Sequence, residues 1–220
     1  MQPFLPVGGR PRRVLAIGAH ADDIEIGCGG ALLTLLRAEP GVHVTWLILT
    51  AGGQRADEAR ASAEAFLADA GSFDLRIVGL RDGFLPYGPE AKEVFEELKG
   101  EVDPQLVFTH ARSDLHQDHR LACELTWNTF RDHTILEYEV PKFDGDLGQP
   151  NVYIGLTEEV TREKLRLLHS HFPSQSGKHW FDAETFLGLM RLRGMEARCP
   201  ERYAEAFYGR KIVLNLDGVA

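Results

Sequence analysis

The feature that most constrains the fold is an alternation, over the first 140 residues, of short apolar runs with longer amphipathic segments. The runs are almost continuously apolar, as in strands buried on both faces of a parallel sheet, and the segments between them carry apolar residues at helical spacing. Strands and helices that alternate in this way form βαβ units. The predicted strands are 13–19, 43–49, 75–79, 106–109 and 135–140, and the predicted helices are 30–41, 55–70, 89–100 and 119–131.

The chain beyond residue 140 is less regular. No linker long enough to divide the chain is visible, so we expect one domain over residues 1–220, with irregular elements of a substrate pocket within about 141–208. The predicted fold class is α/β, a Rossmann-like, mostly parallel sheet with helices on both faces. The predicted elements of this part are a loop at 141–150, an edge strand at 152–156, helices at 158–172 and 182–193, and a closing strand at 211–216.

The charge balance limits the choice of partners. The chain has 33 acidic against 24 basic residues, a formal net charge of −9. A nucleic-acid partner requires a basic face, so we expect none, whereas a few local cations suffice to bind an anionic small molecule. No apolar run approaches the roughly 20 residues that cross a bilayer, so we expect no membrane span.

The cysteines and the first residues indicate a reducing compartment. Cys28, Cys123 and Cys199 are far apart and form no CxxC pair. The first twelve residues contain Pro and Gly and no continuous apolar stretch, so they do not read as a signal peptide. We therefore expect reduced thiols and a cytoplasmic location. The oligomeric state stays open, a homo-oligomer included.

A histidine and two aspartates follow the first predicted strand. His20, Asp22 and Asp23 stand where that strand ends, and in open α/β sheets ligands bind at the carboxyl ends of strands. His20 and Asp23 offer nitrogen and oxygen donors of the kind that zinc accepts, whereas Asp22 cannot point the same way and is available for another task. Capping of the following helix explains one of the acids, at about 0.3–1 kcal/mol, but not the histidine.

A second cluster follows the fourth predicted strand, at the same edge of the sheet. His116 and His119 are three residues apart, so both can face one point from a loop or a helix start. Asp118 between them can orient an imidazole through its free N–H. The neighbouring His110 and Asp114 have simpler explanations, a satisfied strand end and a closed turn.

The two clusters together predict a metal centre. A catalytic zinc takes three protein ligands and keeps an open position for water, and each cluster supplies part of such a set. We expect one zinc ion per chain. Ligands of these types also bind Fe²⁺, Co²⁺ or Mn²⁺, so these ions are alternatives.

The residues around both clusters resemble the PIG-L-type (LmbE-like) zinc-dependent N-deacetylases. The family's first motif, A/P-H-P-D-D with an acidic residue and a glycine-rich stretch behind it, is similar to residues 19–30, and its second motif, H-x-D-H, is met at 116–119. Ala21 stands where the family usually has proline, which fixes φ at about −65°; no ligand is lost. Further stretches that resemble the family are 50–53 with Arg55 and Glu58, 80–83, 171–175 and 202–207.

The resemblance implies a reaction and a role for each of these residues. The implied reaction is the removal of an N-acetyl or other acyl group from an amino-sugar-containing small molecule. The implied zinc ligands are His20, Asp23 and His119, and the implied general base is Asp22. His116 would donate a hydrogen bond or a proton to the developing tetrahedral intermediate, and Asp118 would support a neighbouring histidine. Arg55 and Asp82 would contact the substrate.

Other functions remain open from the residues alone. The same machinery would hydrolyse another linear amide or a carbamoyl group. The glycine-rich stretch at 27–30 suggests a non-catalytic nucleotide-binding α/β module, but Leu32 replaces the third glycine of the dinucleotide motif, and close helix–sheet packing explains the glycines. A structural metal protein without turnover is a third class, which the presence of Asp22 and His116 argues against.

A thiol and three histidines near or beyond these motifs have simpler explanations. Cys28 lies close to the first cluster but is more typical of a small buried hydrophobe than of a zinc ligand. His169, His171 and His179 either line the mouth of the pocket or lie on the surface, and the second explanation is the simpler one.

Overall fold

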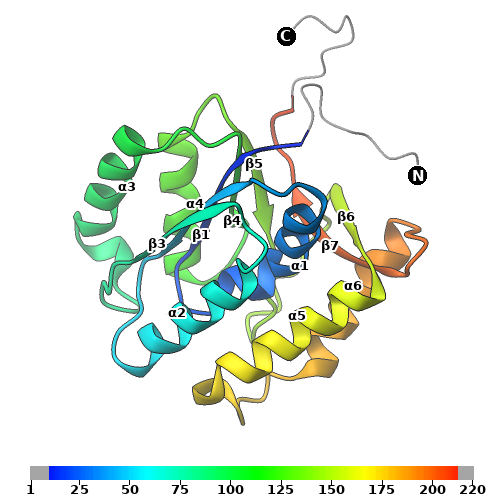
Figure 1. Cartoon of the computed structure of the whole chain (residues 1–220). Coiled ribbons are helices and arrows are strands. Elements are labelled where there is room, and N and C mark those ends of the chain that lie inside the picture. Colours follow the sequence, from blue (N-terminus) through cyan, green and yellow to red (C-terminus); the bar gives the residue numbers. More distant parts are fainter. Residues whose placement is uncertain (1–9, 213–220) are drawn as a thin grey trace, which may run out of the picture.

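Seven strands form one sheet among residues 10–212, the part of the chain that the computed structural model describes. Their order is β3-β2-β1-β4-β5-β7-β6 (Figure 1). The strands from β3 to β5 in this order are parallel, whereas β7 is antiparallel to β5 and to β6. The strands are β1 (Arg13–Gly18), β2 (His43–Ile48), β3 (Ser72–Ile77), β4 (Leu106–His110), β5 (Thr134–Tyr138), β6 (Val152–Leu156) and β7 (Tyr203–Tyr208).

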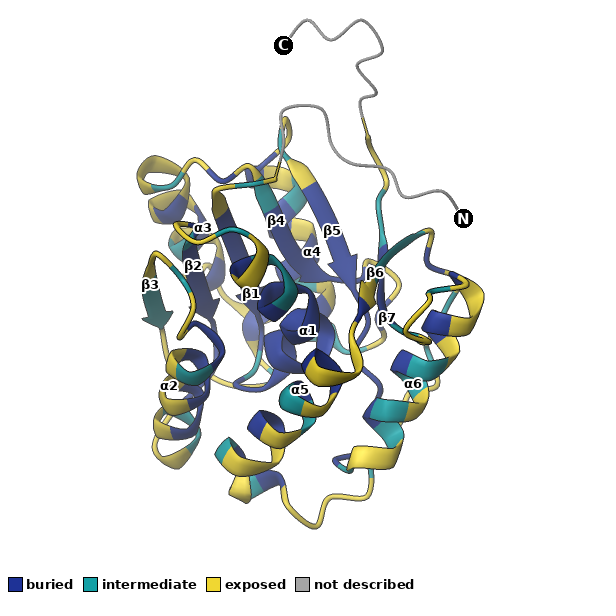
Figure 2. Ribbon diagram, turned by 45° about the vertical axis from the view of Figure 1, so that its right-hand side comes forward, coloured by how far each residue is buried: buried dark blue, intermediate teal, exposed yellow. Residues whose placement is uncertain are grey.

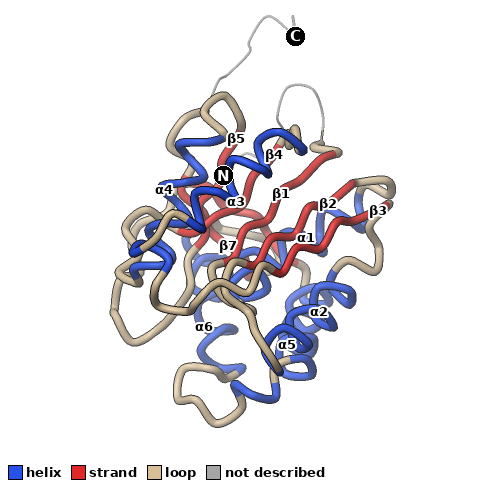
Figure 3. Tube along the Cα trace, turned by 90° about the vertical axis from the view of Figure 1, so that its left-hand side faces the viewer, coloured by secondary structure: helices blue, strands red, loops and turns tan. Residues whose placement is uncertain are grey.

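Helices cover both faces of the sheet, which confirms the predicted fold class. As Figures 1 and 3 show, α3 and α4 pack on one face and α1, α2, α5 and α6 on the other, each side with an apolar core of its own. Among the described residues, no helix combines the length and the apolar character needed to cross a membrane. The helices are α1 (Asp23–Ala38), α2 (Gln54–Phe66), α3 (Glu90–Glu101), α4 (Gln117–Thr129), α5 (Glu158–His171) and α6 (Ala183–Glu196), with short 3₁₀ turns η1 (Leu85–Tyr87) and η2 (Pro173–Gln175).

The order of the strands reverses at β1. The chain runs from β1 outward to β2 and β3, and it then returns to β4 on the other side of β1. Ligands of open α/β sheets bind at such a point, outside the carboxyl ends of the strands. The polar clusters that follow β1 and β4 in the sequence therefore lie where this fold places its ligands.

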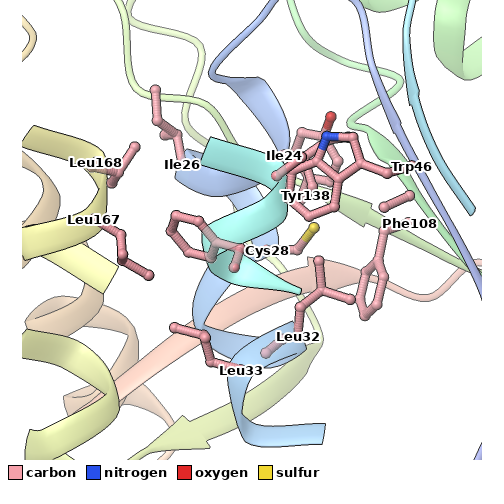
Figure 4. Close-up of a cluster of buried hydrophobic side chains, with 14 of the residues drawn as sticks. Ile24, Ile26, Cys28, Leu32, Leu33, Trp46, Phe108, Tyr138, Leu167 and Leu168 are labelled. Atoms are coloured by element: carbon pink, nitrogen blue, oxygen red, sulfur yellow. The ribbon is translucent and has the colours of Figure 1, made fainter. Parts of the chain in front are cut away.

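Helix α1 is buried along most of its length (Figure 2). Its glycines allow it to lie close to the sheet, because a Cβ atom at Gly27 would be 2.1 Å from the ring of Tyr138 and one at Gly30 would be 2.6 Å from Leu156. Figure 4 shows the apolar side chains packed around this helix, with the sulfur of Cys28 among them. The glycine-rich stretch thus serves helix–sheet packing.

A buried ion pair connects α1 to the later part of the chain. The carboxylate of Glu205 accepts hydrogen bonds from the main-chain N–H groups of Gly30 at 2.8 Å and Ala31 at 2.7 Å. Lys164 donates to Glu205 and to the carbonyl oxygen of Ile26, both at 2.6 Å. Burial of these charges is tolerated because each is paired and hydrogen-bonded.

Two elements differ from the prediction. Helix α1 begins at Asp23 and not at residue 30, because the glycine-rich stretch packs as a continuous helix against the sheet. The last strand is β7, in which the buried Glu205 interrupts the apolar run. Of the closing strand predicted at 211–216, residues 211 and 212 are irregular and the others lie outside the described residues.

The three cysteines are free. Cys28 and Cys123 are buried, whereas Cys199 is partly exposed. Burial raises the pKa of the Cys28 thiol well above its ordinary value, so this side chain behaves as a small apolar group.

Candidate metal centre

The loops that follow β1 and β4 bring the two polar clusters together. The two strands are parallel neighbours, so their carboxyl ends lie side by side. His20 stands in the loop after β1, and Asp23 opens α1. His116 is the N-cap of α4, and His119 lies in the first turn of that helix.

Three donor atoms from the two loops meet at one point. Nδ1 of His20 lies 3.0 Å from Nε2 of His119 and 3.2 Å from Oδ2 of Asp23, and the last two atoms are 3.5 Å apart. Ligand atoms at about 2.0–2.1 Å from a tetrahedral zinc ion are about 3.3–3.4 Å from one another. The spacing of these three atoms therefore fits the ligands of a single ion.

The protonation of these groups also fits a cation. Asp114 accepts a hydrogen bond from Nδ1 of His119 at 2.9 Å, so Nε2 of His119 directs a lone pair at the common point. Burial disfavours a charged His20, but the carboxylates of Asp23, Asp118 and Asp82 together outweigh it and raise the pKa of His20 well above its ordinary value. The surroundings therefore favour positive charge at the point where a metal ion would sit.

His110 lies beside this set without belonging to it. Its Nε2 is 3.2 Å from Oδ2 of Asp23, but the same nitrogen accepts the main-chain N–H of Ala19 at 3.0 Å, so its lone pair is already engaged. The ring is fully buried and stacks on the ring of His119, with 3.9 Å between centroids. His110 thus fastens the loop after β1 to the end of β4.

His116 lies beside the donor atoms, because one of its ring nitrogens is within 4.8 Å of ligand atoms of His20 and His119. Its Nδ1 accepts the main-chain N–H of Asp118 at 3.3 Å, which caps α4 and leaves the ring proton on Nε2. The ring lies edge to face against His20, with centroids 4.7 Å apart. Burial lowers the pKa of His116, and the neighbouring His119 and His20 lower it further, so the ring is a neutral hydrogen-bond donor.

Asp22 is the acid directly beside the donor set. Its Oδ1 accepts a hydrogen bond from Nη2 of Arg55 at 2.7 Å, whereas its Oδ2 is buried and has no hydrogen-bond partner among the described residues. Burial raises the pKa of Asp22 above its ordinary value, and the charge of Arg55 opposes this effect. An unengaged oxygen with a raised pKa suits a general base.

The C-terminal part of the chain supports Arg55. Glu58 lies 3.4 Å from Nη1 of Arg55 and accepts the main-chain N–H of Ser174 at 2.9 Å. The guanidinium also lies 5.5 Å from the ring centroid of Phe172. The stretch at 171–175 therefore reaches the same site as the segment that carries Arg55.

Asp82 and Asp118 lie at the other nitrogen of His20. Nε2 of His20 is 3.1 Å from Oδ1 of Asp82 and 3.5 Å from Oδ2 of Asp118. Asp118 accepts the main-chain N–H groups of Gly83 at 2.7 Å and Leu85 at 3.2 Å, so it fastens the loop after β3 to α4. The side chain of Asp82 is 75% exposed and is accessible to a substrate.

Asp114 does more than close a turn. Its Oδ2 faces both Nδ1 of His119 and Nζ of Lys142 at 2.9 Å, and its Oδ1 accepts the main-chain N–H of His116 at 2.8 Å. From the sequence alone we expected Asp114 only to close a turn, and nothing singled out Lys142. The position of Asp114, five residues before the histidine ligand, could have indicated that it contacts that histidine. Lys142 offers no such local pattern, because it reaches the site only through the path of its loop.

The other sequence candidates lie apart from these groups. Cys28 and the histidines at 169, 171 and 179 belong to none of the potential metal-binding groups that the described residues form. Cys28 is buried in the core, and His169 and His179 are exposed. The simpler explanations therefore fit Cys28, His169 and His179, whereas His171 is partly buried at the start of the stretch that reaches the site.

Comparison with known proteins identifies the sequence family. The model of the PIG-L family, described as GlcNAc-PI de-N-acetylase, matches residues 15–130, just over half of the chain. A relative from Escherichia coli K12, the uncharacterized deacetylase YaiS, is 28% identical over 179 residues, which cover 76% of this chain and 95% of that protein.

Solved structures share the fold. The N,N'-diacetylchitobiose deacetylase of Pyrococcus horikoshii has a TM-score of 0.68 at 22% identity, covering 90% of this chain and 83% of that one. GalB, the 4-carboxy-2-hydroxymuconate hydratase of Pseudomonas putida KT2440, has a TM-score of 0.68 at 18% identity, covering 93% and 99%. At such low identity these likenesses show the fold alone, on which both a deacetylase and a hydratase are built. The family match concerns the sequence itself, and by that match the chain belongs to the PIG-L family.

Proposed function

We propose that this chain is a metal-dependent deacetylase that removes an N-acetyl or other acyl group from an amino-sugar-containing small molecule. Membership of the PIG-L family and the relative named a deacetylase support the reaction type. The observation that carries the metal is the set of His20 Nδ1, Asp23 Oδ2 and His119 Nε2, which lie 3.0–3.5 Å from one another. We take zinc as the ion, one per chain, although Fe²⁺, Co²⁺ and Mn²⁺ accept the same donors.

The chain's own residues perform the proton transfers of the proposed reaction. When bound, the ion supplies a Lewis acid that polarises the amide carbonyl and lowers the pKa of a water molecule. The unengaged Oδ2 of Asp22 takes a proton from this water and later passes it to the leaving nitrogen. The Nε2–H group of His116 donates a hydrogen bond to the carbonyl oxygen as negative charge develops there.

The remaining residues position the base and the substrate. Arg55 holds one oxygen of Asp22, and we assign its remaining donors to the substrate. The exposed carboxylate of Asp82 accepts a hydrogen bond from a sugar hydroxyl. Asp118 supports His20 at Nε2, the ring nitrogen that is not one of the three donor atoms. We further propose that the pocket walls lie within about 141–208 and that the enzyme is cytoplasmic.

Metal analysis combined with acetate release tests this function. The purified protein is expected to hold about one divalent ion per chain and to release acetate from a member of a panel of free and glycosidically linked N-acetyl amino sugars. The variants Asp22→Asn and His116→Ala are expected to keep the ion and to lose about 10²–10⁴-fold in kcat. Glu97→Gln, which neutralises an exposed acid on α3 outside the site, is the matched control.

Each contrary result has a distinct meaning. Release of another acyl or a carbamoyl group would keep the mechanism and change the substrate. Hydration of an unsaturated acid without acetate release would assign the chain to the chemistry named for GalB. Near wild-type turnover of metal-loaded Asp22→Asn would refute the role of the base, and a protein without stoichiometric metal would refute the function as a whole.

A further inference from the structure

Lys142, in the loop between β5 and β6, carries an ammonium group that the proposed reaction does not use. Its side chain is only 12% exposed. Nζ lies 2.9 Å from Oδ2 of Asp114, 2.5 Å from Oδ2 of Asp146 and 3.4 Å from the carbonyl oxygen of Val140. Two of its N–H groups donate hydrogen bonds to Val140 and Asp146, and its contact with Asp114 is an ion pair. Lys142 is therefore held within the protein by two carboxylates and a carbonyl oxygen.

Asp114 connects this lysine to the metal centre. The oxygen that faces Lys142 is the one that accepts the hydrogen bond of His119, and both contacts are 2.9 Å long. The other oxygen of Asp114 accepts the main-chain N–H of His116 at 2.8 Å. Carboxylates that accept the free N–H of a histidine ligand fix the orientation of its ring and tune its affinity for the metal.

Asp146 joins the same cluster from the loop of Lys142. Its Oδ2 contacts Lys142 and accepts the main-chain N–H of Leu115 at 2.7 Å. Lys142 lies between two carboxylates, so the cluster holds one positive and two negative charges, and the lysine ties Asp114 to the neighbouring Asp146. The contribution of Lys142 therefore comes from geometry: it holds Asp114 at the position in which that carboxylate meets His119.

We propose that Lys142 is a positioning residue for the metal ligand His119 and that it acts through Asp114. The inference rests on the proposed function, because it concerns the ion that His119 would help to hold. The loop between β5 and β6 is then part of the metal centre, although it supplies no ligand.

Metal affinity, measured by competition with a chelator of known Zn²⁺ affinity, tests this role. Lys142→Met keeps the aliphatic stem, loses the contacts to the carboxylates and is expected to bind Zn²⁺ about 10-fold more weakly. Lys142→Arg keeps the charge and is expected to recover part of the loss. Lys92→Met removes a lysine from an exposed pair with Glu96 on α3 and is expected to bind like the wild type.

A double-mutant cycle tests the route through Asp114. In the Asp114→Asn background, Lys142→Met is expected to cost little further affinity, because the contact is already changed. The inference is overturned if Lys142→Met costs less than about twofold on its own, or if it costs as much in the Asp114→Asn background. A lowered melting temperature of metal-free Lys142→Met that arginine does not rescue would assign the lysine to folding and also overturn it. A wild-type protein that binds no ion would refute the proposed function itself, which is a separate result.

Discussion

The loops after β1 and β4 both contribute to the candidate metal centre, but they are held in place differently. In the first loop, the carbonyl oxygen of Ala19 accepts the N–H and the hydroxyl of Thr50 at 2.9 and 2.7 Å, and the N–H of Ala19 donates to His110. In the second loop, the carboxylate of Asp114 pairs with Lys142 from the next loop of the chain. Both loops begin by continuing the sheet, the second through the N–H of Ala111 and the carbonyl oxygen of Tyr138 at 3.0 Å, but beyond Ala111 the second loop depends on charged side chains.

This difference indicates which property, stability or metal affinity, a change in each loop will lower. Main-chain hydrogen bonds at the end of a buried strand break when the core opens, so the geometry of the first loop follows global stability. A charged contact can be removed singly while the core stays folded. We therefore expect changes in the second loop to lower metal affinity at nearly constant stability, and changes in the first to lower stability.

The largest effect is expected in the second loop. Asp114→Asn keeps the shape of the side chain but weakens the acceptor for Nδ1 of His119, and it is expected to lower Zn²⁺ affinity about 10–100-fold. Chelator competition measures the affinity, and urea unfolding of the metal-free protein measures the stability. Glu97→Gln on α3 is the control on an exposed carboxylate outside the site. Unchanged affinity of Asp114→Asn would show that the second loop does not need this charge.

A smaller effect, and one of a different kind, is expected in the first loop. His110→Leu leaves the buried N–H of Ala19 without an acceptor, which costs about 1–3 kcal/mol in the free energy of unfolding. Urea unfolding of the metal-free protein measures this loss, with His179→Leu on the surface as control. If the folded His110→Leu protein kept its stability and lost as much metal affinity as the Asp114 variant, the contrast between the loops would be wrong.

The smallest effect concerns the proposed base Asp22, which ends the first loop as the N-cap of α1. Burial raises the pKa of Asp22 and Arg55 opposes the rise, so Arg55→Met is expected to raise that pKa further. Because the base acts only when deprotonated, the acid limb of kcat/KM is expected to move to higher pH, while the limb at high pH stays in place. Arg60→Met on the exposed face of α2 is the control. A shift to lower pH would mean that Arg55 does not stabilise the ionised Asp22.

The sequence makes predictable those residues of the site that directly follow the ends of strands. Apolar runs locate β1 and β4, and the polar residues directly behind them, His20, Asp23 and His119, are brought together because these strands are parallel neighbours. Periodicity also recovers the alternation of strands and helices. The resemblance to a family adds the roles of these residues, which remain proposals.

The parts that the sequence left unpredicted depend on contacts between distant segments. The pairing of Lys142 with Asp114 requires the path of an irregular loop, and no local pattern encodes that path. Strand β7 escaped detection because Glu205 stands in it, and the burial of this carboxylate is made acceptable by Lys164 on α5 and by main-chain N–H groups of α1. The early start of α1 results from its packing against the sheet, which overrides local propensity.

The buried thiol of Cys28 gives the protein a reporter of its own motions. It lies where α1 packs against the sheet, and its raised pKa leaves almost no reactive thiolate in the folded state. An alkylating reagent will therefore modify Cys28 only during transient separation of α1 from the strands, whereas the partly exposed Cys199 reacts from the native state. The ratio of the labelling rates of Cys28 and Cys199 measures how often α1, which begins with Asp23, separates from the sheet.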